Sequence, residues 1–114
     1  MLPIIQEKQL LPQEMEVWYI LPAIRKELAR ALVDLGLSQK NIATILNITQ
    51  AAVSQYKKDK RANTLQFDEA TKREIMRTAT RIKSHPETIF KEIMHIDNYL
   101  KQNGIFCKLH KQKS

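Results

Sequence analysis

The chain has 114 residues, of which 43% are apolar and only two are glycine, and its formal net charge is +7. This length corresponds to one domain, or to one small domain with a helical extension. Few glycines favour helices over a sheet with many turns. No apolar run approaches the roughly 18 residues that a membrane span needs, and the N-terminus lacks the pattern of a secretion signal. One cysteine excludes an internal disulfide framework. We therefore expect an all-α, cytoplasmic protein that does not enter a membrane.

The positive charge is unevenly distributed. Residues 36–64 contain five Lys or Arg and one acidic residue, and the last fourteen residues add four lysines, whereas the rest is close to neutral. Clustered positive charge suits a polyanion, because neutralised phosphates release their condensed counterions. A membrane surface would also attract the basic tail, but the tail has too few apolar residues for an amphipathic helix.

The N-terminal part predicts an arm and one helix. Residues 1–11 are short and poorly patterned. Pro12 suits the first turn of a helix, and the acidic side chains that follow suit its positive end. Pro22 interrupts an apolar stripe and is expected to kink or restart the helix there. The stripe consists of Val17, Ile20, Ile24 and Leu28.

Residues 36–58 predict two short helices joined by a tight turn. Glycine ends the preceding helix, a hydroxyl side chain caps the start of each short helix, and asparagine occupies the turn, where positive φ is needed. These four residues are Gly36, Ser38, Asn47 and Thr49. The two helices are expected over 39–46 and 50–58.

The apolar residues of the two helices agree with this arrangement. The first helix and the turn are expected to turn Ile42, Ala43, Leu46 and Ile48 inward. The second is expected to turn Thr49, Ala52, Val53 and Tyr56 inward, at about 100° per residue. The outward side of the second helix then carries amides, a hydroxyl, a methyl and an amine without a carboxylate. Two helices crossed in this way present one of them to the major groove of DNA.

Residues 21–61, LPAIRKELARALVDLGLSQKNIATILNITQAAVSQYKKDKR, resemble the helix-turn-helix of the phage Cro and repressor superfamily, the XRE-type regulators. More narrowly, they resemble a group of short transcriptional regulators found mainly in archaea. The resemblance implies DNA binding as a dimer and a role in transcription. Asn47 departs from the glycine that is usual in the turn.

The resemblance and the patterns together predict a small bundle of five or six helices. It comprises a lambda-repressor-like helix-turn-helix and a C-terminal helical extension. Residues 1–21 form the arm and first helix, 22–64 the DNA-binding core, and 65–114 the C-terminal helices with a basic tail.

The outward residues of the second short helix are expected to contact DNA bases. Glutamine can bond adenine bidentately, a methyl group can meet the thymine methyl, and serine can bond either kind of group. The predicted base-contacting residues are Gln50, Ala51, Ser54 and Gln55. By analogy with the repressors it resembles, Gln39 should bond a phosphate and brace Gln50. The predicted contacts to the DNA backbone are Gln39, Thr49, Tyr56, Lys57, Lys58, Lys60 and Arg61.

Two more helices are expected after residue 64. Asp68 caps the first, which runs to Ser84 with Ile75, Ala79 and Ile82 inward. Pro86 opens the second, Gly104 ends it, and its apolar stripe is Ile89, Ile93, Ile96 and Leu100. This stripe can pack on the bundle as core or build a two-fold dimer interface, and Phe90 and Met94 widen it. We expect a homodimer, because readers of this class match pseudo-palindromic operators.

Other chemistry is not expected. Cys107 and His110 form a C-x-x-H pair, but nothing else supports a zinc site, so no metal or cofactor is predicted. Trp18 and Tyr19 are interpreted as core or interface anchors. The sequence contains no phosphate-binding loop, nucleophile elbow or paired-carboxylate site, so an enzyme is not expected. The predicted function is a transcriptional regulator, a repressor in the simplest case. The alternative is a protein-interaction module of the same fold, such as an antitoxin or an adaptor of the transcription machinery.

Overall fold

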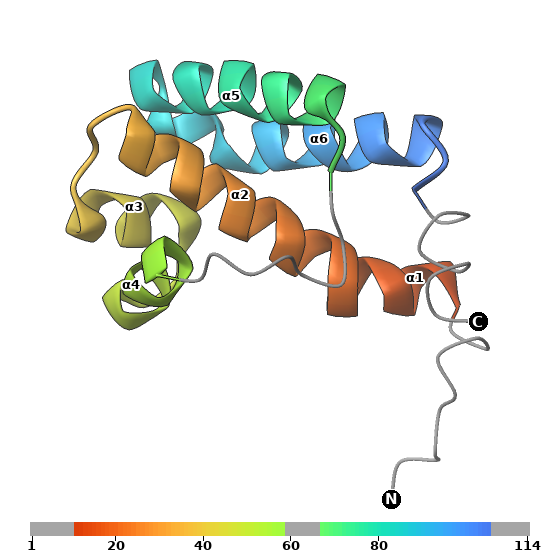
Figure 1. Cartoon of the computed structure of the whole chain (residues 1–114), viewed down its shortest axis with the longest axis horizontal. Coiled ribbons are helices and arrows are strands. Elements are labelled where there is room, and N and C mark those ends of the chain that lie inside the picture. The colour runs from red at the N-terminus through yellow and green to blue at the C-terminus, as the bar shows by residue number, and fades with distance from the viewer. Residues whose placement is uncertain (1–10, 59–66, 106–114) are drawn as a thin grey trace, which may run out of the picture.

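The computed structural model describes residues 11–58 and 67–105, and these residues form helices without a strand. The expected all-α bundle is therefore confirmed (Figure 1). The elements are α1 (Pro12–Met15), the π-helical turn η2 (Glu16–Ile20), α2 (Leu21–Asp34), α3 (Gln39–Leu46), α4 (Gln50–Lys58), α5 (Glu69–Ser84), the 3₁₀ turn η3 (Pro86–Thr88) and α6 (Ile89–Gln102).

Helix α2 is the centre of the bundle. It packs against α3 and α4 at one end and against the antiparallel pair of α5 and α6 along its length (Figure 1). The largest side chains that are completely buried come from all of these helices: Ile20, Ile24, Leu28, Leu32, Ile42, Val53, Ile82 and Ile96. Each such side chain stabilises the fold by roughly 1.5–3 kcal/mol relative to exposure. One shared core therefore holds α3 and α4 in place.

The N-terminal helix was expected to kink or restart at Pro22, and instead it continues from Pro12 into α2 with a π-helical turn immediately before Leu21. Pro22 has no N–H to donate to the preceding turn, and the N–H of Leu21 instead donates to the carbonyl of Glu16, five residues earlier. This wider turn inserts one residue into the helical repeat. The predicted stripe is therefore wrong at Val17, whose side chain is 59% exposed, whereas Met15 is buried.

The two C-terminal helices form largely as predicted. The carboxylate of Asp68 accepts a hydrogen bond from the N–H of Thr71 at 2.8 Å and so caps α5. The inward residues Ile75, Ala79 and Ile82 are buried. In α6, Ile96 and Leu100 are buried, and Ile89 and Ile93 are half-buried against the same core. The stripe of α6 therefore packs on its own bundle, while Phe90 and Met94 remain 75% and 46% exposed.

Charged side chains fasten α6 to its neighbours. The guanidinium of Arg81 on α5 donates to both carboxylate oxygens of Glu92 at 3.1 Å. The ring of His95 lies 2.6 Å from the carboxylate of Glu74, and this contact lowers the pKa of Glu74. These pairs tie α6 to α5 along its first half.

A second cluster joins α6 to η2. The ammonium of Lys101 lies 2.8 Å from the carboxylate of Glu16 and 2.9 Å from that of Asp97. Burial raises the pKa of Asp97, whereas hydrogen bonds with Asp97 and Lys101 lower the pKa of Glu16. The turn η2 is thus held against α6.

Candidate nucleic-acid interface

The end of α2 and the start of α3 are defined by local hydrogen bonds. Gly36 adopts φ +92°, and the N–H of Leu37 donates to the carbonyl of Leu32, so the free carbonyls at the end of α2 find partners. The hydroxyl of Ser38 accepts from the N–H of Asn41 at 3.1 Å. The glycine stop and the serine cap predicted from the sequence are both present.

The turn between α3 and α4 depends on a left-handed residue. Asn47 has φ 56° and ψ 48°, and is the one non-glycine residue with positive φ in the part of the chain that the structure describes. The N–H of the next residue, Ile48, then donates to the carbonyl of Ala43 at 3.0 Å. The hydroxyl of Thr49 accepts from the N–H of Ala52 at 3.0 Å and caps α4. The predicted helix, turn and second helix are therefore formed.

The two short helices cross closely. Ala43 is buried at the crossing, as are Ile42 and Leu46 on α3 and Val53 on α4. Across the crossing, the side-chain amide of Gln39 donates to the main-chain carbonyl of Gln50 at 2.9 Å. Gln39 thus braces the backbone at the start of α4, and the contact to Gln50 does not involve the Gln50 side chain.

The inward side of α4 differs from the prediction at one residue. Val53 is completely buried, and Ala52 and Tyr56 are half-buried as expected for that side. Thr49, which was expected to turn inward, is exposed, because its hydroxyl points along the helix axis to the free N–H of Ala52.

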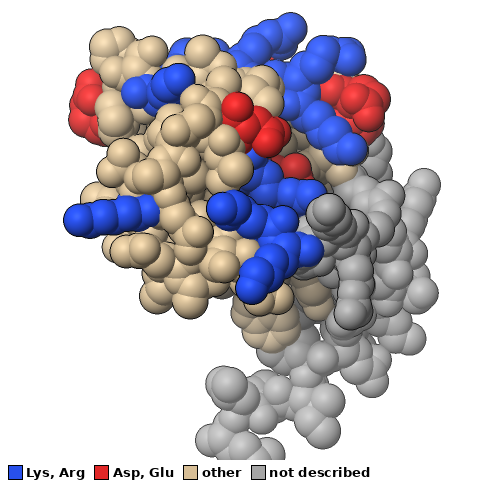
Figure 2. Space-filling view, turned by 60° about the vertical axis from the view of Figure 1, so that its left-hand side comes forward, with Lys and Arg blue, Asp and Glu red and all other residues tan. Residues whose placement is uncertain are grey.

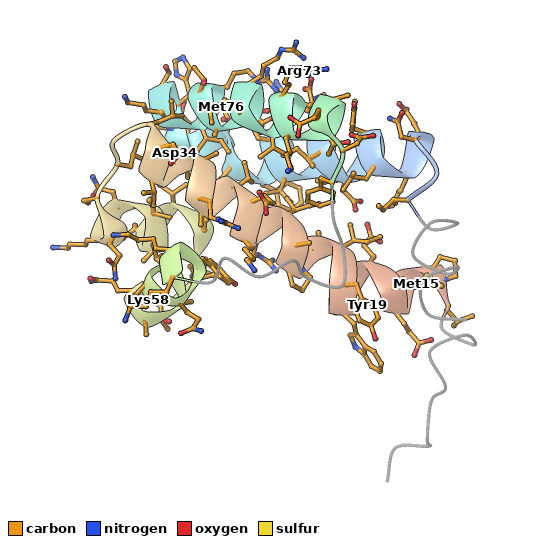
Figure 3. The ribbon with its side chains drawn as sticks, viewed as in Figure 1. Met15, Tyr19, Asp34, Lys58, Arg73 and Met76 are labelled. Atoms are coloured by element: carbon orange, nitrogen blue, oxygen red, sulfur yellow. The ribbon has the colours of Figure 1, made fainter. Side chains whose placement is uncertain are left out.

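The outward side of α4 is exposed and contains no acidic residue. Gln50, Ala51 and Gln55 are exposed, whereas Ser54 is half-buried at the edge of this surface. Lys57 and Lys58 are exposed in the last turn, where positive charge suits the negative end of the helix. Figure 3 places Lys58 at the outer end of α4, away from α5. Three of the four predicted base-contacting residues are therefore freely accessible.

The charged side chains of α3 and α4 are all positive. Helices α3 and α4 together contain three lysines, Lys40, Lys57 and Lys58, and neither aspartate nor glutamate. Figure 2 turns this end of the molecule forward, and the lower half of the view shows Lys and Arg without Asp or Glu among the coloured residues. Lys40 was not predicted as a contact, although its place in the first turn of α3, next to Gln39, could have indicated it.

One further residue that sequence reasoning missed supports this unit. Lys83, near the end of α5, donates from its ammonium to the carbonyl of Leu35 at 2.9 Å. The two residues are 48 positions apart, so no local pattern could have indicated the contact. It stabilises the negative end of α2 immediately before the helix-turn-helix.

Some predicted residues lie outside the described residues. These are the backbone contacts Lys60 and Arg61 and the pair Cys107 and His110. Within residues 11–58 and 67–105, no group of three or more His, Cys, Asp or Glu could hold a metal ion. None of the helices described is long and apolar enough to cross a membrane.

The chain matches no protein-family model, no curated protein and no solved structure.

Proposed function

We propose that the protein is a sequence-specific regulator of transcription that binds double-stranded DNA as a homodimer, with α4 in the major groove. The observation that carries the proposal is the exposed side of α4, which offers amide, methyl and ammonium groups and no carboxylate. The major groove of B-DNA accommodates one α-helix and presents a distinct pattern of donors and acceptors for each base pair.

The exposed side chains divide into two roles. Gln50 and Gln55 are suited to adenine, and the methyl group of Ala51 to the thymine methyl. Ser54, being half-buried, reaches only a base at the edge of the footprint. These contacts select a sequence, whereas contacts to phosphates orient the protein without reading it.

The proposed phosphate contacts flank α4 on both sides. Lys57 and Lys58 lie in its last turn, and Gln39 lies at the start of α3 with its amide near the first turn of α4. Thr49 and Tyr56 are proposed for the same role, as are Lys60 and Arg61, from the sequence alone. We add Lys40, which is exposed beside Gln39.

The proposal includes a location and a mode of action. A protein that occupies a promoter in the cytoplasm excludes the polymerase, so repression is the simplest outcome. Neither a small-molecule effector nor a cofactor enters the proposal.

Selection of bound sequences from a random DNA pool tests the function. We expect a two-fold symmetric consensus whose half-sites lie about one helical turn apart. Lys58→Ala removes an exposed lysine of α4 and should lower the affinity for DNA. Lys72→Ala removes an exposed lysine of α5 and is the matched control. Equal DNA affinity of these two variants, or the absence of any consensus, would contradict the proposal.

One observation favours a second candidate, a protein-interaction module such as an antitoxin or a transcription adaptor. Phe90 and Met94 are exposed four residues apart on α6 and form an apolar surface for a partner. Under this function, Phe90→Glu abolishes capture of a partner protein while Gln50→Ala has no effect. If the protein instead reads DNA, Gln50→Ala weakens operator binding and Phe90→Glu has no effect on it.

A further inference from the structure

A second apolar surface lies at the other end of the bundle, on the helix that runs through α1, η2 and the first turn of α2. Three of its side chains are exposed and three are half-buried, whereas the residues between them are largely buried, so the six lie on the side of that helix away from the core. We call it the N-terminal face. Its residues are Glu14, Val17, Trp18, Leu21, Pro22 and Arg25.

The opposite side of the same helix accounts for the other residues of this segment. Met15, Ile20, Ala23 and Ile24 are buried in the core. Glu16 is turned away from the N-terminal face, because its carboxylate binds the ammonium of Lys101 at 2.8 Å. The N-terminal face therefore has an apolar centre with Val17 59% and Trp18 50% exposed.

The ends of the N-terminal face carry opposite charges. Glu14 lies at the end nearer the N-terminus and Arg25 at the other, and the apolar residues lie between them. If two copies of this helix pack antiparallel about a two-fold axis between residues 19 and 20, Glu14 of one meets Arg25 of the other. Trp18 then meets Leu21, and Val17 meets Pro22. An isologous interface requires this self-complementarity.

We propose that the N-terminal face is the homodimer interface, occupied by the same face of a second copy. Trp18 lies at the centre of the face, and Trp is one of the residue types enriched at the energetic centres of protein interfaces. The inference rests on the proposed function in one respect, since a protein that binds a two-fold symmetric operator must itself form a two-fold symmetric dimer. The sequence-based expectation left the α6 stripe open as core or as dimer interface, and it interpreted Trp18 and Tyr19 as core or interface anchors.

The position of this face favours it over the surface at Phe90 and Met94. Figure 3 shows Met15, which immediately precedes η2, and Tyr19, which lies within it, on the same lower side of the bundle as Lys58 of α4. Helices α5 and α6 lie along the upper side (Figure 1). The segment that carries the N-terminal face therefore lies on the side of the molecule that carries the proposed DNA-binding helix.

The fluorescence of the single tryptophan gives a direct test, because Trp18 lies at the centre of the proposed interface. On dilution of the purified full chain, we expect its emission to shift to longer wavelength over the same concentrations at which sedimentation velocity shows dimer becoming monomer. Val17→Glu, which retains Trp18, should raise the dimer dissociation constant about tenfold or more. Phe90→Glu is the matched control and should change it by less than about twofold.

Charge exchange tests the antiparallel arrangement. Glu14→Arg and Arg25→Glu each place like charges together and should weaken the dimer, whereas the double variant should restore it. Circular dichroism melting of each variant separates loss of dimer from loss of fold.

Three results would overturn the interface: a wild-type monomer at all concentrations, dissociation caused by Phe90→Glu instead of Val17→Glu, or no restoration in the double variant. Sedimentation is measured without DNA, so these results do not depend on the proposed function. A dimer of this form that selects no DNA sequence would contradict the function alone.

Discussion

The side-chain amide of Gln39 donates a hydrogen bond to the main-chain carbonyl of Gln50 at 2.9 Å and so joins the first residue of α3 to the first residue of α4. The bond fixes the start of α4 relative to α3 independently of the conformation of the Gln50 side chain, because the acceptor is a main-chain carbonyl. It also leaves the Gln50 amide exposed for another partner.

Gln39→Glu should destabilise the fold, because it replaces an amide donor with a carboxylate facing a carbonyl oxygen. Loss of the bond is expected to cost about 0.5–1.5 kcal/mol in the free energy of unfolding, measured by urea denaturation. Lys40→Ala, at the neighbouring exposed position, is the control and should change it by less than about 0.5 kcal/mol. Equal stability of Gln39→Glu and the wild type would show that the bond does not hold α4.

Gln50→Ala should relax base preference at one or two operator positions and cost about 1–3 kcal/mol of binding free energy. The physical reason is the loss of a bidentate bond to one base, while the Gln39 contact to the main chain is retained. Quantitative binding to a panel of operator variants measures the effect. An unchanged order of affinities across the panel would remove Gln50 from the base-contacting residues.

Lys58→Ala should weaken binding to all DNA sequences alike, because an ammonium that meets a phosphate carries no sequence information. The slope of the logarithm of affinity against the logarithm of salt concentration should fall by about 1. Titrations at several salt concentrations measure this slope for a specific and a random duplex. Loss of affinity for the specific duplex alone would make Lys58 a base contact instead.

Asn47→Val should destabilise the helix-turn-helix, because a β-branched residue is strained at φ 56°. A cost of about 1–3 kcal/mol is expected, whereas Asn47→Gly should be as stable as the wild type, since glycine adopts this conformation without strain. Thermal unfolding followed by circular dichroism compares the variants. A valine variant as stable as the glycine variant would mean that the turn adopts another conformation.

Stability should decrease in acid partly through Glu74. Its hydrogen bond with His95 lowers the pKa of this carboxyl below the ordinary value of 4.5 in the folded protein. The contribution is therefore present above pH 4.5 and is lost as the pH falls through the lower folded value. Melting temperatures of the wild type and Glu74→Gln between pH 7 and pH 3 measure the effect.

The Glu74→Gln variant should be less stable than the wild type at neutral pH, and the difference should shrink in acid. Glu87→Gln, which changes an exposed carboxylate of η3, serves as the control and should follow the wild-type profile. A constant difference between Glu74→Gln and the wild type at every pH would exclude the ionisation of Glu74 as the cause.

Local signals in the sequence were enough to predict the helix boundaries around the turn. Gly36, Ser38, Asn47 and Thr49 act through hydrogen bonds or backbone angles that involve residues no more than a few positions away. Their effect is therefore readable without knowledge of the rest of the fold. The cap of α5 at Asp68 was predicted for the same reason.

The errors occurred where a residue depends on more distant groups. Val17 fits the apolar stripe by spacing, but the π-helical turn before Pro22 rotates it to the surface. For the stripe of α6, the sequence left open a place in the core or in a dimer seam, and the structure packs its residues on the bundle of their own chain. Periodicity indicates that a side of a helix is covered, and it contains no information about which surface covers it.

By itself, the sequence determined the all-α class, the caps and the left-handed turn, and the absence of carboxylates from the outward side of α4. These properties follow from residue types and short-range geometry. Only the tertiary structure decided that Gln39 holds the backbone of Gln50, that Lys83 caps α2 across 48 residues, and that Trp18 rather than the α6 stripe is exposed. Those outcomes depend on how helices distant in the chain pack around α2, and this packing is a property of the whole core.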